Sequence, residues 1–405
     1  MSTGLLERLS GGGEPETLRA GFAQALAALK EARFAGPDGG SRSVQELPWY
    51  VLIGAPGSGK TTALVNSGLG FPLRSPAAAP APVPGIGGTR NCDWWFTDQA
   101  VLLDTAGRYT TQESSARADA LEWQAFLGLL REHRPLLPLN GVLVTVSVSD
   151  LMLWDAAERQ RYAGHVRMRL AELYAGLGLQ VPVYALVTKS DLLAGFSEFF
   201  GELDAAARGQ VWGVTFEAGF DPSVVGIAKR FEEELRSLER RLYAEMVARL
   251  GEEPDAARRA AIYRFPQQLH ALIPLLAEFL GMAFTTQQDH KPPMLRGVYL
   301  TSGTQEGSPI DRVLGALARA FSLERQAAGV LQAGAGRSYF LTRLLREVVF
   351  AEAGLAVSGE ALARRRRKRR LAAVAALAVL AAAIAWPMAA HYLEARAALA
   401  QSQAR

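Results

Sequence analysis

The stretch Gly54 to Thr61, which reads GAPGSGKT, decides the fold of this chain. It fills every fixed position of the pattern G-x-x-x-x-G-K-[ST], and it directly follows an apolar run from Trp49 to Ile53. Glycines let such a loop turn sharply after a strand, so that backbone N–H groups surround phosphate oxygens at the start of the next helix. The sequence therefore predicts a P-loop that binds a nucleoside triphosphate.

Each part of this loop has an expected role. Lys60 reaches the β and γ phosphates, and the hydroxyl of Thr61 ligates Mg²⁺. The alternative is a Gly-rich turn with a solvent-facing lysine, but further phosphate-site motifs downstream argue against it. The residues expected to bind nucleotide here are Gly54, Ala55, Pro56, Gly57, Ser58, Gly59, Lys60, Thr61 and Thr62.

Two further motifs follow in the order that GTPases use. Thr89 ends a Pro-, Ala- and Gly-rich loop, residues 75–88, where a switch-one threonine contacts Mg²⁺ and the γ-phosphate; an ordinary loop threonine is the alternative. Asp104 and Gly107 form a D-x-x-G pattern after an apolar strand. The aspartate is expected to hold Mg²⁺ through water, and the glycine N–H to meet the γ-phosphate. The predicted metal site is Thr61, Thr89 and Asp104.

A fourth motif concerns the base. Thr188, Lys189 and Asp191 follow an apolar run and fit the pattern [NT]-K-x-D. A carboxylate there accepts two hydrogen bonds from guanine, which adenine does not offer in the same geometry; the alternative is that Asp191 caps the following helix. Ser302, in the loop 301–308, is a candidate to complete the base pocket. The expected cofactors are GTP, with ATP as the alternative, and Mg²⁺.

One departure bears on catalysis. The residue after D-x-x-G is Arg108, whereas Ras-like GTPases have a glutamine that orients the attacking water. Charge stabilisation by Arg108 and water orientation by Gln112 are two open alternatives. The candidate catalytic residues are Lys60, Thr89, Asp104, Gly107 and Arg108. Whether the chain is an enzyme stays open, and the pattern fits a slow NTPase that prefers GTP to ATP.

Apolar runs and helical patterns alternate along the chain. This alternation predicts an α/β fold, a P-loop GTPase-like three-layer sheet with helices on both faces. The pattern turns helical from about Asp204 to Phe284. The expected strands are Trp49 to Ile53, Asn91 to Phe96 and Gln99 to Leu103 joined at Thr97–Asp98, Val142 to Val148, Val181 to Thr188, and Gly297 to Leu300.

Composition excludes several classes of protein. A chain of 405 residues predicts two or more domains. One cysteine, Cys92, excludes an internal disulfide, and no C-x-x-C or H-E-x-x-H pattern suggests a zinc site. The net charge of +4 is local, because residues 364–370 (RRRRKRR) contribute +7 and leave 4 − 7 = −3 for the rest. No nucleic-acid partner is therefore expected.

The segment that follows the basic run predicts a membrane anchor. Leu371 to Ala390 is free of charged residues, and twenty residues span about 30 Å as a helix, the thickness of a bilayer core. The basic flank marks the cytoplasmic end, and Trp386 and Tyr392 lie near the other end. A buried soluble helix is the alternative. We expect one C-terminal transmembrane helix, with residues 1–370 cytoplasmic and residues after 390 periplasmic.

These readings give an order of domains. An amphipathic helical segment and a flexible joint at Gly36 to Ser43 precede the P-loop strand, and a helical extension leads to the membrane. The expected parts are residues 1–45, N-terminal helical segment; 46–200, P-loop GTPase-like domain; 201–295, helical insertion; 296–308, last strand and base loop; 309–363, helical extension; 364–370, basic flank; 371–390, transmembrane helix; and 391–405, start of a periplasmic region.

Four stretches resemble the TssM (IcmF) family, the large inner-membrane component of bacterial type VI secretion systems. The similarity covers roughly residues 45 to 390 and exceeds any generic NTPase motif in length. The stretches are LPWYVLIGAPGSGKTTALVNSGLGFPL (Leu47 to Leu73), GTRNCDWWFTDQAVLLDTAGRYTTQ (Gly88 to Gln112), VTKSDLL (Val187 to Leu193) and RGVYLTSGTQEG (Arg296 to Gly307).

The resemblance implies partners and a place in the cell. It implies an inner-membrane protein that assembles with TssL and the lipoprotein TssJ, contacts membrane lipid, forms homo-oligomers in the complex and docks baseplate components such as TssK. Family members usually begin with a transmembrane hairpin, and residues 1–34 hold no apolar run long enough for one, so we expect a fragment of a longer protein.

Three functions remain open on the sequence. The first is a membrane-anchored, GTPase-like scaffold whose nucleotide state biases assembly or baseplate docking. The second is an ATPase that energises secretion, with Asp104 as a Walker-B-type aspartate. The third is a structural anchor in which the nucleotide pocket is vestigial.

Overall fold

The computed structural model describes residues 19, 22–23, 34–35, 41–42, 47–71, 92–111, 116–217, 226–285, 292–303, 337–358 and 386. The chain divides into two compact units, Met1–Val357 and Ser358–Arg405. Within the second unit the described residues are Ser358 and Trp386, and Trp386 is helical and exposed. Thr89, Gln112 and the basic run lie outside the described residues.

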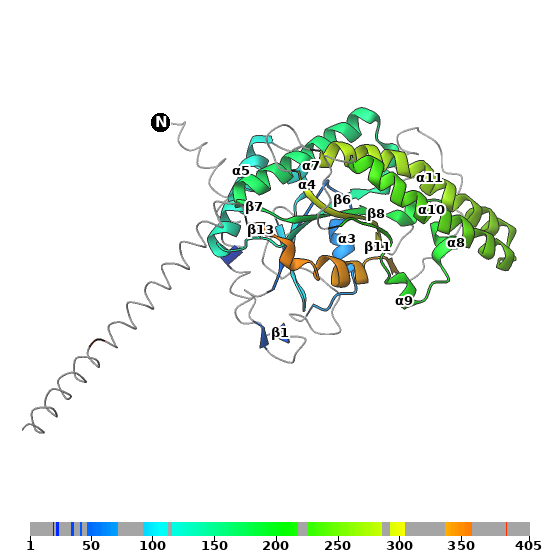
Figure 1. Ribbon diagram of the computed structural model, residues 1–405, viewed down its shortest axis with the longest axis horizontal. Helices are drawn as coiled ribbons and strands as arrows, with labels where there is room; N and C mark the ends of the chain where they lie inside the picture. The colour runs from blue at the N-terminus through cyan, green and yellow to red at the C-terminus, as the bar shows by residue number, and fades with distance from the viewer. Residues whose placement is uncertain are drawn as a thin grey trace, which may run out of the picture. The chain divides into compact units, whose positions relative to one another are not determined.

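The first unit is built on a seven-stranded sheet in the order β4-β5-β3-β6-β8-β10-β9, of which Figure 1 labels β6 and β8. The five strands from β5 to β10 are parallel, and β4 and β9 run antiparallel at the two edges. The strands are β3 Trp49–Gly54, β4 Cys92–Phe96, β5 Val101–Thr105, β6 Gly141–Ser147, β8 Pro182–Thr188, β9 Gly213–Thr215 and β10 Met294–Leu300. The predicted α/β class is confirmed, and six of the seven strands overlap the expected ranges, β9 being the exception.

Helices connect these strands. The α-helices are α3 Lys60–Val65, α4 Gly107–Thr111, α5 Ala116–His133, α6 Val148–Leu153, α7 Ala156–Leu177, α8 Phe196–Phe200, α9 Ala205–Arg208, α10 Ile227–Glu252 and α11 Ala256–Phe284. Shorter turns are the 3-10 helices η2 Ser190–Leu192 and η4 Ala353–Leu355, and the π-helix η3 Leu344–Val349. Two-stranded pairs are β1 Phe34–Ala35 with β2 Ser41–Arg42, β11 Ser302–Gly303 with β12 Ser338–Tyr339, and β7 Leu179–Gln180 with β13 Val357–Ser358.

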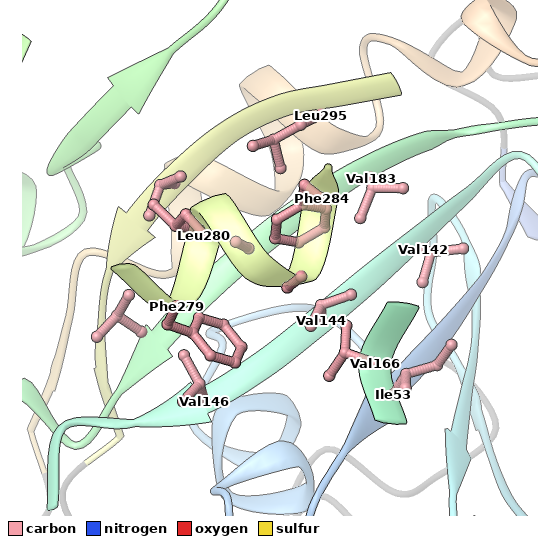
Figure 2. Close-up of a cluster of buried hydrophobic side chains, with 14 of the residues drawn as sticks. Ile53, Val142, Val144, Val146, Val166, Val183, Phe279, Leu280, Phe284 and Leu295 are labelled. Carbon is pink, nitrogen blue, oxygen red and sulfur yellow. The ribbon is translucent and has the colours of Figure 1, made fainter. Parts of the chain in front are cut away.

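One face of the sheet is covered by α5, α7 and α11. Figure 2 shows Phe279, Leu280 and Phe284 of α11 against the valines of β6 and β8, with Val166 of α7 beside them. The central parallel strands are buried at every position, because helices cover both faces. Phe22 also packs on this core, 4.7 Å from the Trp94 ring, as expected for an amphipathic N-terminal segment.

The opposite face is covered by α3 and by residues 337–356, here called the covering segment (Figure 1). Leu344, Leu345 and Val349 pack on this face, and the Tyr50 hydroxyl donates a 2.7 Å hydrogen bond to the Val349 carbonyl. The chain thus returns to its first central strand near the end of the unit. Helices on both faces give three layers.

The structure corrects three expectations about the elements. The stretch from Asp204 to Phe284 is not helical throughout, because β9 at Gly213–Thr215 pairs with β10. The hairpin turn lies one residue later than expected: Thr97 N–H bonds to the Ala100 carbonyl, leaving Asp98 and Gln99 at the tip. The joint at 36–43 includes one strand of the β1–β2 pair.

The predicted membrane span is not tested by this fold. Apart from Trp386, residues 371–390 lie outside the described residues. Among the helices that the structure does describe, none has the length and apolar character needed to cross a bilayer.

Candidate functional site

The loop between β3 and α3 lies where the order of strands reverses. β5 is on one side of β3 and β6 on the other, and the chain passes from β5 through α4 and α5 to β6, on the other side of β3. In open parallel sheets, ligands bind outside the carboxyl ends of the strands at such a switch point. The fold therefore puts residues 54–61 where a ligand site is expected.

The loop is held in shape by its glycines and by neighbouring threonines. Gly57 and Gly59 have positive φ angles of 73° and 84°, which favour glycine. The Thr188 hydroxyl donates to the Ser58 carbonyl at 2.6 Å, and the Ser58 and Thr145 hydroxyls lie 2.7 Å apart. A Cβ on Gly59 would meet Thr188 Oγ1 at 3.1 Å. Side chains of β6 and β8 thus fix the loop from outside.

Lys60 folds back into this loop. Its Nζ donates to the carbonyl of Gly54 at 2.7 Å and to that of Ala55 at 3.0 Å. Burial lowers the pKa of Lys60 to about 8, and the charge of Asp104 acts in the opposite direction. A buried ammonium at the centre of the loop is suited to pair with an anion.

Thr61 and Asp104 meet directly. The Thr61 hydroxyl donates to Asp104 Oδ2, and Asp104 Oδ1 is buried with no hydrogen-bond partner among the described residues. Burial raises the pKa of Asp104, while the Thr61 hydrogen bond and Lys60 oppose that rise. A carboxylate oxygen and a hydroxyl oxygen in this arrangement are suitable ligands for Mg²⁺.

Asp93 was not identified from the sequence. It stands directly opposite Asp104 in the β4–β5 ladder, and its side chain is buried. Burial and the Asp104 charge raise the pKa of Asp93 to about 7. The sequence feature that could have revealed Asp93 is the expected pairing of these two strands, because it puts Asp93 and Asp104 on the same face of the sheet.

Gly107 lies against the P-loop. A Cβ on Gly107 would sit 2.3 Å from the backbone nitrogen of Pro56, so only glycine fits. Thr110, one turn later, accepts a 3.1 Å hydrogen bond from the Gly54 N–H. The D-x-x-G turn and the P-loop therefore pack together, as a shared phosphate site requires.

Arg108 points elsewhere. Its Nη2 lies 2.6 Å from Glu122 Oε2, and its Nη1 lies 3.7 Å from Asp119 Oδ1, both on α5. The Tyr109 hydroxyl donates to the same Glu122 oxygen at 2.8 Å. The Arg108 guanidinium thus contacts carboxylates of α5. The role of Arg108 in catalysis stays a prediction.

The base-recognition motif forms a second cluster. The Ser302 hydroxyl donates to Asp191 Oδ1, and the Ser190 N–H donates to the Thr301 carbonyl at 3.1 Å. Burial raises the pKa of Asp191, and the Ser302 hydrogen bond opposes that rise. Lys189 adopts a left-handed φ of 58°. The structure brings together the two loops that the sequence assigned to the base.

Sequence reasoning also missed Tyr162. Its hydroxyl accepts from the Ala55 N–H at 3.0 Å and donates to the Thr145 carbonyl at 2.8 Å. A tyrosine in the middle of α7 carries no local signal for this role, since the contact depends on how α7 crosses the sheet. Tyr162 ties the P-loop to β6.

Comparison with known proteins identifies relatives. The family model of the IcmF-related N-terminal domain matches residues 116–377. The type VI secretion system component TssM1 of Pseudomonas aeruginosa is 51% identical over 354 residues, which are 87% of this chain and 32% of that protein. The chain therefore spans about a third of the length of this curated relative.

Two solved structures are weakly similar to this chain. A small COPII coat GTPase SAR1 from Encephalitozoon cuniculi in complex with GDP is 15% identical, covering 47% of this chain and 64% of its own, with a TM-score of 0.23. The signal recognition particle receptor SRb-GTP/SRX complex from Chaetomium thermophilum is 14% identical, covering 67% and 99%, with a TM-score of 0.26. Neither likeness carries weight at these scores.

Proposed function

This chain belongs to the TssM (IcmF) family of type VI secretion components, and from that premise we propose that it is a nucleotide-binding, GTPase-like scaffold whose nucleotide state biases assembly of the secretion complex or docking of its baseplate. The fold class proposed is that of P-loop GTPases. The cofactors proposed are GTP, or ATP as the alternative, and Mg²⁺.

The observation that carries this proposal is the convergence of Lys60, Thr61 and Asp104 beside the P-loop. The Lys60 ammonium is held by loop carbonyls, the neighbouring Thr61 hydroxyl donates to Asp104 Oδ2, and Asp104 Oδ1 has no hydrogen-bond partner among the described residues. These are the groups that a magnesium-bound triphosphate needs. An anchor with no ligand would gain nothing from a buried ammonium and a buried carboxylate oxygen left without a hydrogen bond.

The preference for GTP rests on Asp191. Its carboxylate is held by the Ser302 hydroxyl, and Ser190 N–H joins the same two loops. A carboxylate fixed in this way accepts hydrogen bonds from the N1 and amino groups of guanine. Adenine has no donor at N1, and a buried acceptor left unpaired lowers affinity.

The covering segment contacts both ends of the proposed nucleotide pocket, so a change of bound nucleotide would act on it. The Thr342 hydroxyl donates to the Ser67 carbonyl at 2.7 Å, just after α3. β12 pairs with β11, which contains Ser302. In sequence, the covering segment precedes the basic run 364–370. A change at the phosphate end or at the base end of the pocket would therefore act on the same segment.

Location and partners are part of the same proposal. We place the chain at the bacterial inner membrane, with residues 371–390 as the span and the nucleotide site on the cytoplasmic side. Its partners would be TssL and TssJ in the membrane complex, baseplate components such as TssK, membrane lipid, and further copies of the chain.

The test is equilibrium binding of fluorescently labelled GTP and ATP to the full chain, with and without Mg²⁺. We expect Mg²⁺-dependent binding that unlabelled GTP displaces better than ATP. Lys60→Ala should abolish binding, while Lys229→Ala, which removes an exposed lysine on α10, should leave it unchanged.

The outcomes separate the three functions. Equal affinity for both purines would reject the guanine assignment, and Asp191→Asn should shift preference toward xanthosine triphosphate if it is correct. ATP turnover stimulated by other secretion components would favour an ATPase. Secretion that survives both Lys60→Ala and Asp104→Ala would favour a structural anchor with a vestigial pocket.

A further inference from the structure

Two buried carboxylates stand side by side next to the P-loop. Asp93 on β4 and Asp104 on β5 are direct partners in the antiparallel ladder. Residues opposite each other in such a ladder point to the same face, with Cβ atoms about 4.5–5.5 Å apart. This is the face that α3 covers, because the neighbouring pair Trp95 and Leu102 packs with Leu64 of α3.

Both side chains are almost fully buried and incompletely paired. Asp93 is 3% exposed and Asp104 is 1% exposed. The Oδ1 atom of each has no hydrogen-bond partner among the described residues. Polar atoms buried to this degree normally have a partner, so two such oxygens on one pair of residues require an explanation.

Stability of the fold does not explain the pair. Like charges directly opposite each other on neighbouring strands are destabilising. The nearby cation, Lys60, directs its Nζ at the carbonyls of Gly54 and Ala55. A divalent cation between the carboxylates would satisfy both free oxygens and cancel the repulsion.

We propose that Asp93 is the second carboxylate of a magnesium site that it forms with Asp104 and Thr61. This deepens, and rests on, the proposed nucleotide function. Mg²⁺ prefers oxygen ligands and keeps several waters when a few side chains hold it. No group of three or more His, Cys, Asp or Glu side chains within the described ranges is arranged to hold a metal, so water and phosphate oxygens complete the set.

The experiment is a titration of the full chain with Mn²⁺, followed by electron paramagnetic resonance, with and without GDP. Asp93→Asn keeps the shape of the side chain and removes one negative charge. Its control is Asp98→Asn, which removes the same charge at the tip of the same hairpin. We expect Asp93→Asn to weaken Mn²⁺ binding by about 10- to 100-fold and Asp98→Asn to leave it unchanged.

Thermal unfolding gives a second readout. Without metal, Asp93→Asn should unfold at the same temperature as the unmodified chain or a higher one, since a like-charge repulsion is removed. Mn²⁺ should raise the unfolding temperature of the unmodified chain and of Asp98→Asn, but much less that of Asp93→Asn.

These experiments distinguish failure of the Asp93 metal site from failure of the proposed nucleotide function. If GDP and GTP bind but Asp93→Asn keeps full Mn²⁺ affinity, the role of Asp93 is overturned and the proposed function stands. If no nucleotide binds, yet Mn²⁺ binding depends on Asp93, the metal site stands and the proposed function fails.

Discussion

Lys60 is a buried ammonium with a pKa lowered to about 8. Bound phosphates favour its charged form, so the nucleotide complex holds the proton at higher pH than the free protein does. The pKa of Lys60 is therefore higher in the nucleotide complex than in the free protein, and at a pH between these two values nucleotide binding takes up a proton. We therefore expect nucleotide affinity to fall as the pH rises above about 8, by at most about tenfold per pH unit. Equilibrium titrations with labelled GTP from pH 7 to pH 9 measure this.

Lys60→Arg is the control for that pH dependence. A guanidinium stays protonated throughout this range, so the variant should bind more weakly but with affinity that follows only the ionisation of the nucleotide. An unmodified chain whose affinity runs parallel to that of Lys60→Arg would show that Lys60 does not titrate near pH 8.

Gly107 has no room for a side chain. In Gly107→Ala, the new Cβ would lie 2.3 Å from Pro56 N and 2.6 Å from Pro56 Cα, which are backbone atoms that yield only if the P-loop moves. We expect the free energy of unfolding to fall by about 1–3 kcal/mol, with weaker nucleotide binding. Urea denaturation followed by circular dichroism measures the stability.

The matched control is Gly128→Ala on α5. No heavy atom lies within 4 Å of a Cβ there, and the residue is exposed in a helix interior. Alanine should stabilise the chain by about 0.5–1 kcal/mol. Equal effects of the two substitutions would mean that the close approach at Pro56 does not constrain the loop.

At single residues, the sequence predicted which motifs come together, but not the direction of every side chain. Thr61 and Asp104 meet, and Ser302 reaches Asp191, because each motif fixes its residues at a strand end. Arg108 is different, since its neighbour Glu122 lies on α5 and depends on how that helix packs. No local pattern encodes such a packing angle.

At the scale of elements, the central strands and the edge strand β4 were predictable, and the strand at the other edge, β9, was not. β3, β6 and β8 are mostly apolar and buried at every position, which is typical of strands covered on both faces. β9 has three residues, Gly213–Thr215, and exists only through its pairing with β10, some eighty residues later. A strand that short has too few residues to show a period of two.

The covering segment is attached by an ion pair between a buried arginine and a partly buried glutamate. Arg296 on β10 is bound by Glu352, with Nε 2.9 Å from Oε2, and Tyr184 also donates to Glu352. Glu352→Ala would leave the Arg296 guanidinium buried without its carboxylate. We expect a loss of about 3–5 kcal/mol in the free energy of unfolding, measured by urea denaturation.

Glu347→Ala serves as its control. Glu347 pairs with Arg343 on the surface of the same segment, and both side chains are about half exposed. Exposed pairs of this kind contribute little to stability, so no measurable change is expected. A loss as large as that of Glu352→Ala would show that the segment depends on general charge and not on the pair of Arg296 and Glu352.

At the scale of the molecule, the predicted span at residues 371–390 sets the topology. An alkaline phosphatase fused after Arg405 should be active, because this enzyme folds only outside the cytoplasm, and deletion of residues 371–390 should abolish that activity. A β-galactosidase fused at the same place should be inactive. Activity of the β-galactosidase fusion would reject the span.

The hydrogen bond from Tyr50 to Val349 joins residues that are 299 positions apart. At roughly 5–20 residues per second, a ribosome completes the covering segment about 15–60 s after it has made β3. During that interval the face of the sheet that contains Tyr50, Tyr184 and Tyr299 lacks Leu344, Leu345 and Val349, and among the described helices α3 alone covers part of it. We therefore expect the nascent chain to need shielding of this apolar face until synthesis is almost complete, and shortened chains that end before residue 337 to aggregate.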